Sequence, residues 1–136
     1  MKKLPKLGAL KRKSWRLFSE YIRRRYADKD GFASCITCSK RFHWKDLQAS
    51  HFLAGRSASI LFLESNCHQA CYDCNVMRYG HLVNYLNFML ATYGQEKIDE
   101  LKRIKNQVFK PSRDYYENLI EEYEGDIEII NKESTR

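Results

Sequence analysis

The sequence predicts an α+β fold in which one small β-hairpin is embedded among several α-helices. Apolar residues recur at helical spacing near both ends, whereas a central segment combines cysteines with short β-prone runs and turn residues. At 136 residues the chain has room for one domain with a modest core. We therefore expect one globular unit made of a basic arm and helix (1–30), a central core (31–94) and C-terminal helices (95–136).

The first helix is expected to follow an irregular basic arm. Pro5 and Gly8 argue against helix in residues 1–13, and Ser14 is a suitable N-cap for a helix that runs to about Asp28. The buried stripe of this helix would consist of Trp15, Phe18, Ile22 and Tyr26.

Between the helical regions, Gln48 to Leu53 and Ile60 to Leu63 are predicted strands, with Gly55-Arg56-Ser57 as the turn. Helical spacing returns at about Tyr72, breaks at Gly80 and stops at Gly94. Two further helices are expected, one ending before Pro111 and one capped by Ser112. The last would bury Tyr115, Tyr116, Leu119, Ile120 and Tyr123.

The charge distribution favours a polyanionic partner. Net charge is +7, and residues 1–25 hold ten Lys and Arg against the single acid Glu20, whereas residues 112–136 hold eight Asp and Glu. We expect the basic residues to bind the DNA backbone, although solvated helix faces would explain the same pattern. The candidate DNA-binding residues are Lys11, Arg12, Lys13, Arg16, Arg23, Arg24 and Arg25.

No apolar run is long enough to span a bilayer, and the basic start is not followed by a signal-peptide pattern. We therefore expect a cytoplasmic protein with no membrane partner. In a reducing cytoplasm, five cysteines are expected to be metal ligands rather than disulfides.

Four of the cysteines form two CxxC pairs, Cys35-Ile-Thr-Cys38 and Cys71-Tyr-Asp-Cys74. Two such turns supply four thiolates to one tetrahedral zinc ion, and this closed coordination predicts a structural role. The rival interpretation is redox use of one pair, but neither pair opens a helix in a thioredoxin-like context. Cys67, the fifth cysteine, is expected to be a small buried hydrophobe.

Three residues between and beside these pairs are candidates for catalysis. His51, in the first predicted strand, is placed to act as a general base. Asn75 directly follows Cys74, so its amide oxygen could point back at the hairpin and face His51 across the bend. Asn66 is suited to holding the loop between the strands by backbone hydrogen bonds. Taken alone, each residue also has an ordinary structural explanation.

Together these residues resemble the zinc-containing HNH (ββα-metal) nucleases, such as the junction-cleaving endonuclease VII, and more closely the phage lambda NinG (Rap) recombination protein family. The resemblance covers about half the chain. It rests on Cys35-Ile-Thr-Cys38, Ala49-Ser50-His51-Phe52, Asn66-Cys67-His68-Gln69-Ala70-Cys71, Cys74-Asn75, Leu82-Val83-Asn84-Tyr85 and Tyr93-Gly94-Gln95-Glu96.

The resemblance implies that residues 31–94 are the core of an HNH endonuclease. Such an enzyme would nick branched, Holliday-junction-type DNA in phage recombination, with His51, Asn66 and Asn75 as catalytic residues. It would need Mg²⁺ or Mn²⁺ as catalytic ion beside the structural zinc. Because resolving a four-way junction takes two symmetric nicks, we also expect a homodimer.

The sequence departs from the HNH pattern at Ser50, where the usual residue before the base is acidic. A neutral hydroxyl is a poor Mg²⁺ ligand, so the catalytic ion is expected on Asn75 with His68 or Ser50, and Asp73 is the next candidate. Two alternatives stay open: a non-catalytic zinc-containing module that binds DNA, and an HNH nuclease that acts on ordinary duplex DNA.

Overall fold

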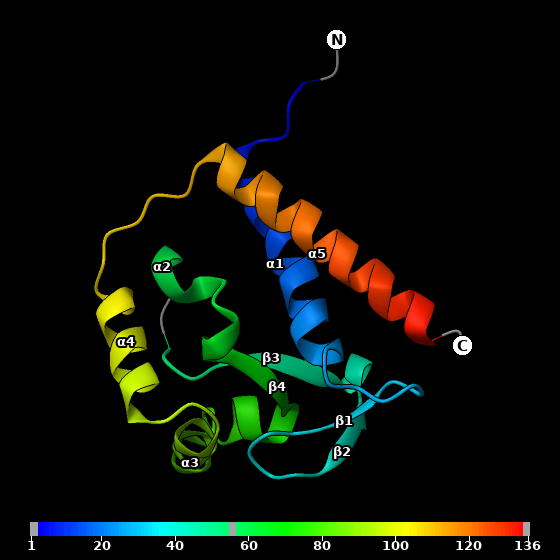
Figure 1. The fold of residues 1–136 in the computed structure, drawn as a ribbon, viewed down its shortest axis with the longest axis vertical. Helices are drawn as coiled ribbons and strands as arrows, with labels where there is room; N and C mark the ends of the chain where they lie inside the picture. Colours follow the sequence, from blue (N-terminus) through cyan, green and yellow to red (C-terminus); the bar gives the residue numbers. More distant parts are fainter. Residues whose placement is uncertain (1–2, 55–56, 135–136) are drawn as a thin grey trace.

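The computed structural model describes residues 3–54 and 57–134, and it confirms the α+β class (Figure 1). Within these residues the strands form two antiparallel two-stranded sheets. Positions 55 and 56 of the predicted turn lie outside this description. The elements are α1 (Leu7–Arg24), β1 (Phe32–Ser34), β2 (Arg41–His43), η1 (Trp44–Asp46), β3 (Leu47–His51), α2 (Ala58–Leu61), η2 (Glu64–Asn66), β4 (Cys67–Cys71), η3 (Asp73–Met77), α3 (Leu82–Thr92), α4 (Gln95–Lys105) and α5 (Arg113–Ser134).

Helix α1 begins eight residues earlier than predicted and ends at Arg24 rather than at about Asp28. Pro5 lies before the helix, and Lys6 is the extended residue that starts it. Burial of Leu10 against α5 stabilises the first turns of this helix. Ser14 therefore lies inside the helix, where its hydroxyl donates to the Tyr116 carbonyl at 3.4 Å instead of capping a terminus.

Helices α1 and α5 lie side by side and form the largest part of the core (Figure 1). From the predicted stripe of α1, Phe18 and Ile22 are fully buried, whereas Tyr26 lies beyond the helix and is 64% exposed. Ser112 caps α5 as predicted, because its Oγ accepts from the Tyr115 N–H at 3.2 Å. The inward positions of α5 are Tyr116, Ile120 and Tyr123.

The central hairpin is formed by β3 and β4, which pair from Leu47↔Cys71 to His51↔Cys67. The first strand agrees with the sequence-based expectation, but the second was placed too early. Ile60 lies in the short helix α2 and is fully buried there. Pairing resumes only at Cys67, because the Phe52 N–H donates to the Asn66 carbonyl and closes the hairpin at that point. Every residue of β4 is buried, including His68 and Gln69.

Figure 1 shows α1 on one side of the hairpin and α3 on the other. The polypeptide leaves β4 through one π-helical turn, η3, and is then redirected at Gly80, whose φ is 92°. Helices α3 and α4 pack through Tyr85, Met89, Ile98 and Leu101. None of the helices in the described ranges has the length and apolar character needed to cross a bilayer.

Candidate metal centre and active site

The four cysteines of the CxxC pairs converge on one point. Cys35 and Cys38 lie in the turn that joins β1 to β2, Cys71 ends β4 and Cys74 lies in η3. Their sulfur atoms all lie within 4.8 Å of one another, and Cys38 Sγ is 3.8 Å from Cys71 Sγ. Tetrahedral coordination at ordinary Zn–S lengths separates the sulfurs by about 3.8 Å. The cluster therefore fits one zinc ion, as the sequence predicted.

Neighbouring groups favour the thiolate form of one ligand. Although burial opposes ionisation, hydrogen bonds from the Thr37 hydroxyl and from nearby backbone N–H groups lower the pKa of Cys35 to about 6. His81 Nδ1 lies 3.4 Å from Cys74 Sγ, a suitable position for a donor that supports a metal-bound sulfur. Cys67 stays outside the cluster, and burial raises the pKa of its thiol to about 12. It is a buried hydrophobe, as predicted.

His51 lies at the end of β3, and its ring is held from two directions. Nε2 lies 2.9 Å from the Leu61 carbonyl, and the ring stacks on Trp15 of α1 with centroids 5.4 Å apart and planes 21° apart. Because a carbonyl only accepts, Nε2 carries the proton and Nδ1 has a free lone pair. Burial lowers the pKa of His51, so the neutral ring is favoured.

Asn66 holds the loop between the strands. Its Oδ1 accepts from the Leu53 N–H at 2.9 Å, and its Nδ2 donates to the Leu53 carbonyl at 3.2 Å. The side chain is completely buried. These bonds position the segment that follows His51, in the manner expected from the sequence.

Asn75 does not approach His51 in the way we expected. Its Nδ2 donates to Gln48 Oε1 at 2.6 Å, so it lies beside the start of β3 rather than its end. Gln48 and His51 point to opposite faces of an extended strand, and their Cα atoms are about 10 Å apart along it. The two side chains therefore do not face one another across the bend, and a single ion shared by both is not supported.

His68 was our first candidate for the missing metal ligand, and the structure contradicts that role. The Tyr85 hydroxyl donates to the Ser50 carbonyl at 2.6 Å, so His68 Nδ1 donates to Tyr85 at 2.9 Å and Nε2 accepts from Tyr93 at 2.8 Å. Both ring nitrogens are occupied and the residue is 1% exposed. Burial and the charge of Arg25 lower the pKa of His68 to about 3.

The two other candidate ligands are also poorly placed for a hard cation. The Ser50 side chain is 2% exposed. Asp73 faces solvent, as anticipated for a residue between two zinc ligands, and it pairs with Arg78 at 2.8 Å. Asn75 is thus the remaining predicted ligand with a partly exposed side chain.

The sequence matches the family model described as "Bacteriophage Lambda NinG protein" over residues 1–133. The chain belongs to the NinG family. It is 31% identical to "Protein ninG" of Escherichia phage lambda over 77% of this chain, and it spans about half of that relative (52%). No solved structure matches it.

In this NinG-family chain the basic residues of α1 fall into two groups. Lys11, Arg12, Lys13 and Arg16 are exposed, although Lys13 pairs with Glu124 of α5 at 3.5 Å. Arg23 binds the Ser19 and Trp44 carbonyls, and Arg24 pairs with Glu20 at 3.0 Å.

Arg25 is the clearest departure from the predicted DNA-binding set. It donates to the Cys67 carbonyl at 2.8 Å, and its side chain is only 8% exposed. Arg25 therefore connects the end of α1 to β4, and its guanidinium is not free to bind a phosphate.

Sequence reasoning missed three partners of the candidate site. Trp15 was expected only as a core residue, but it also stacks on His51. The sequence also gives no sign of the Leu61 carbonyl and the Gln48 side chain, which hold His51 and Asn75. No local signal identifies them, because each lies at least ten residues from its partner and a backbone carbonyl has no signature in a sequence.

Proposed function

We propose that this NinG-family protein is a metal-dependent DNA endonuclease of the HNH type that nicks branched, Holliday-junction-type DNA in phage recombination. The observation that carries the proposal is the environment of His51. A partly exposed imidazole, oriented by a carbonyl and an indole, ends a hairpin that is joined to a four-cysteine cluster. Among the described residues no hydrogen-bond partner is found for Nδ1 of this ring, so this nitrogen is able to accept a proton.

His51 is suited to activate water. Its Nε2–H is engaged by Leu61, so Nδ1 is the atom that takes a proton from the attacking water. The water oxygen then bonds to phosphorus as the bond from phosphorus to the 3′ oxygen breaks. The products are a 5′-phosphate and a 3′ hydroxyl, whose proton comes from solvent.

Mg²⁺ or Mn²⁺, when bound, would supply charge stabilisation for the leaving oxygen. Asn75 Oδ1 would be the protein ligand, since Nδ2 of the same amide donates to Gln48. Within the part of the chain that the structure describes, the only group of three or more metal-ligating His, Cys, Asp or Glu residues is the cysteine cluster. Water and phosphate oxygens would therefore complete the coordination, and we expect the ion to bind weakly without DNA.

The separation of His51 from Asn75 counts against a site in which both residues act on one phosphate, and it favours the non-catalytic DNA-binding module. In an in-line displacement, the attacking water and the leaving oxygen lie on opposite sides of phosphorus. Both positions lie within bonding distance of one phosphorus, so the nuclease would need Asn75 to leave Gln48 and approach the His51 side of β3 when DNA binds.

Branched-DNA preference would come from the shape and deformability of the substrate rather than from base readout. Exposed cations of α1 would contribute affinity. A homodimer would bring two such sites to one junction and make symmetric nicks.

A non-catalytic zinc-containing DNA-binding module is the second candidate. The neutral and buried Ser50 directly before His51 favours it, as does His68, both of whose ring nitrogens are engaged. A nuclease for ordinary duplex DNA is the third candidate, since the same catalytic residues would serve either substrate.

These functions are separated by incubating the zinc-loaded protein with a synthetic four-way junction and with a matched linear duplex at equal salt. The proposal predicts nicks in the junction with Mg²⁺ or Mn²⁺ and none with EDTA. Equal nicking of both substrates would indicate a duplex nuclease. Binding without nicking under every metal condition would leave the DNA-binding module.

A further inference from the structure

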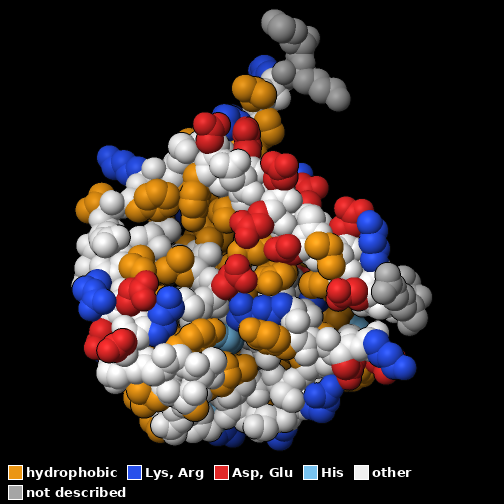
Figure 2. All heavy atoms as spheres, in the orientation of Figure 1, with side chains coloured by type: hydrophobic (Ala, Val, Ile, Leu, Met, Phe, Trp, Pro, Cys, Tyr) orange, Lys and Arg blue, Asp and Glu red, His pale blue; other side chains and the backbone are white. Residues whose placement is uncertain are grey.

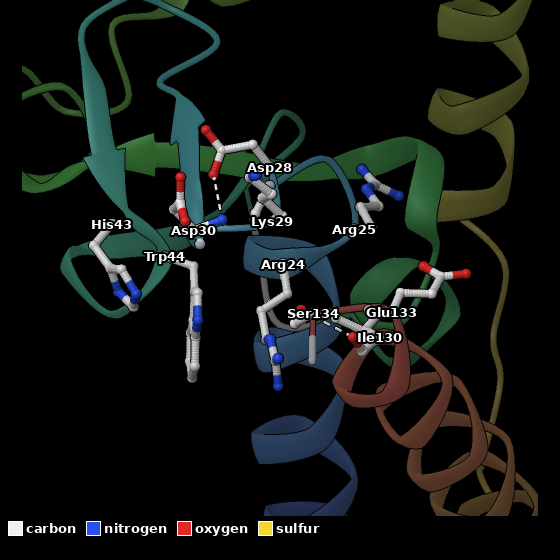
Figure 3. A pocket seen from close by; sticks show the side chains of 12 residues that line it. Arg24, Arg25, Asp28, Lys29, Asp30, His43, Trp44, Ile130, Glu133 and Ser134 are labelled. Carbon is white, nitrogen blue, oxygen red and sulfur yellow. Dashed lines mark hydrogen bonds between the residues drawn. The ribbon is translucent and has the colours of Figure 1, made fainter. Parts of the chain in front are cut away.

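A pocket of about 350 Å³ lies away from His51 and the cysteine cluster (Figure 3). It is formed where the end of α1, the turn before β1 and the start of η1 meet the C-terminal end of α5. Its volume is at the lower end of the range for small-ligand sites. Figure 3 shows the side chains of Trp44 and Arg24 next to one another on its wall, with His43 beside them.

The Trp44 ring lies close to three cations. The guanidinium carbon of Arg24 lies 4.7 Å from the ring centroid, that of Arg23 lies 5.2 Å away and Lys45 Nζ lies 5.8 Å away. Both arginines are held in place: Arg23 donates to the Trp44 carbonyl at 3.3 Å, and Arg24 pairs with Glu20. The imidazole of His43 adds a second ring, 5.7 Å from the first.

This arrangement differs from that of a core tryptophan. Trp44 is partly exposed and belongs to none of the three hydrophobic clusters of the described chain. Its neighbours are polar or charged, so its indole contributes less to the core than a buried ring would. An indole that lines a pocket and lies next to fixed cations offers ring surface on which a flat base can stack.

The charge of the pocket indicates which ligand would be selected. Three cationic and three anionic side chains line it: Arg24, Arg25, Lys29, Asp28, Asp30 and Glu133. A nearly neutral lining does not favour the closely spaced phosphates of a duplex. An unpaired base stacked on Trp44, with its own phosphate near Arg24 or Lys45, satisfies both the ring and the cations.

We propose that Trp44, with Arg24 and His43, forms a stacking site for an unpaired nucleotide of a DNA strand. The proposal rests on the proposed function only in taking DNA as the ligand. It adds that the protein binds unpaired bases, such as those exposed at a branch point, at a site separate from the proposed catalytic site at His51. Duplex DNA does not offer such a base, because its rings are stacked within the helix.

The test uses tryptophan fluorescence of the zinc-loaded Trp15→Phe variant, in which Trp44 is the single remaining tryptophan of the two in the chain. Without divalent ions, the protein is titrated with a ten-nucleotide oligo-dT, with oligo-rU of the same length and with a blunt duplex. We expect quenching by oligo-dT and little change with the duplex. No quenching by oligo-dT would overturn the proposal, and clearly tighter binding of oligo-rU would overturn the assignment to DNA.

Affinity in the otherwise unaltered protein gives a second, independent measurement. Trp44→Ala should weaken oligo-dT binding about tenfold, because one base loses its stacking partner. Trp44→Phe should keep most of the affinity, and the slope of log K against log salt should be unchanged in both variants. Phe109→Ala removes another partly exposed aromatic ring and is the matched control, with no expected effect.

Equal oligo-dT affinity of Trp44→Ala and Phe109→Ala, with circular dichroism showing both folded, would contradict the stacking site. Failure of this inference is distinguishable from failure of the nuclease proposal. His51→Ala should bind oligo-dT like the parent whether or not the parent cuts DNA. If the parent protein does not nick the junction but oligo-dT still quenches Trp44 fluorescence, the result would count against the nuclease proposal and not against the stacking site.

Discussion

The two central histidines of this protein are both held by aromatic neighbours, but their environments suit them to opposite roles. His68 has tyrosine hydroxyls on both ring nitrogens and is buried. His51 has a carbonyl on one nitrogen, a stacked indole and partial exposure. Residue type and position in the hairpin do not distinguish them. The partners of each ring decide which histidine is able to exchange a proton with water.

Replacing Trp15 with alanine should raise the pKa of His51. Burial lowers that pKa in the folded protein, and removing the indole would expose the ring to water. The shift should be visible in an NMR titration of the histidine side chains, while Trp15→Phe should keep most of the depression. A pKa of His51 that is unaffected by Trp15→Ala would show that the stacked ring does not set its environment.

His68 should make stability depend on pH. Its folded-state pKa is about 3, below the ordinary value of about 6.5, so the folded protein binds fewer protons than the unfolded chain between these values. Stability is therefore lost as pH falls from about 6.5 towards 3. Urea unfolding between pH 6.5 and 5.5 should show a smaller pH slope for His68→Gln than for the parent. Equal slopes would mean that His68 is not the group that takes up the proton.

At the scale of elements, the short motifs were predicted well and the boundaries between them less well. The CxxC turns, the Asn66 loop bonds and the Ser112 cap depend on nearby residues and therefore leave a local pattern. The start of α1 depends instead on burial of Leu10 against α5, more than 100 positions away in sequence.

The second strand was misplaced for a similar reason. Ile60 to Leu63 is a short, continuously apolar run of the kind expected for a strand, whereas β4 contains His68 and Gln69 in buried positions. Tyr85 and Tyr93 bind both ring nitrogens of His68, and Gln69 Nε2 donates to the Ser34 carbonyl, although the buried Gln69 Oε1 has no partner among the described residues. The partners come from other elements, so strand propensity alone could not predict them.

Arg25 should be a structural residue that joins α1 to the hairpin. Arg25→Ala removes hydrogen bonds to the Cys67 and Glu64 carbonyls, and it should lower the free energy of unfolding by about 2 kcal/mol. Urea denaturation followed by circular dichroism measures this, and Arg12→Ala, at an exposed position, should change it by less than about 0.5 kcal/mol. If Arg25→Ala is as stable as the parent but binds DNA more weakly, Arg25 has the DNA-binding role that the sequence predicts.

At the scale of the whole molecule, charge is segregated between two helices that pack together. Figure 2 shows acidic side chains gathered over α5. Several of them line the groove shared with α1, namely Glu117, Glu121, Glu124 and Glu128. Lys13 already pairs with Glu124 across this contact. The exposed cations of α1 that remain are therefore expected to define the face that meets DNA.

Replacing Lys11, Arg12 and Arg16 together with glutamine should reduce the slope of log K against log salt for junction binding by about 3, since three phosphate contacts are lost. Fluorescence anisotropy over a salt series measures the slope. The matched control removes the same charge from α4, at Lys102, Arg103 and Lys105, all of which are exposed. If the α4 variant changes the slope as much as the α1 variant, net charge rather than a defined surface determines binding.

The most direct measurement of the central claim is single-turnover nicking of a four-way junction by zinc-loaded parent and His51→Ala proteins, at equal bound fraction and with Mn²⁺ or Mg²⁺. If His51 Nδ1 is the base that activates water, the variant should bind the junction and keep its zinc but nick about 100-fold more slowly or worse. A His51→Ala protein that nicks at the parental rate would contradict the catalytic role of His51 and leave the hairpin as a structural part of a DNA-binding protein.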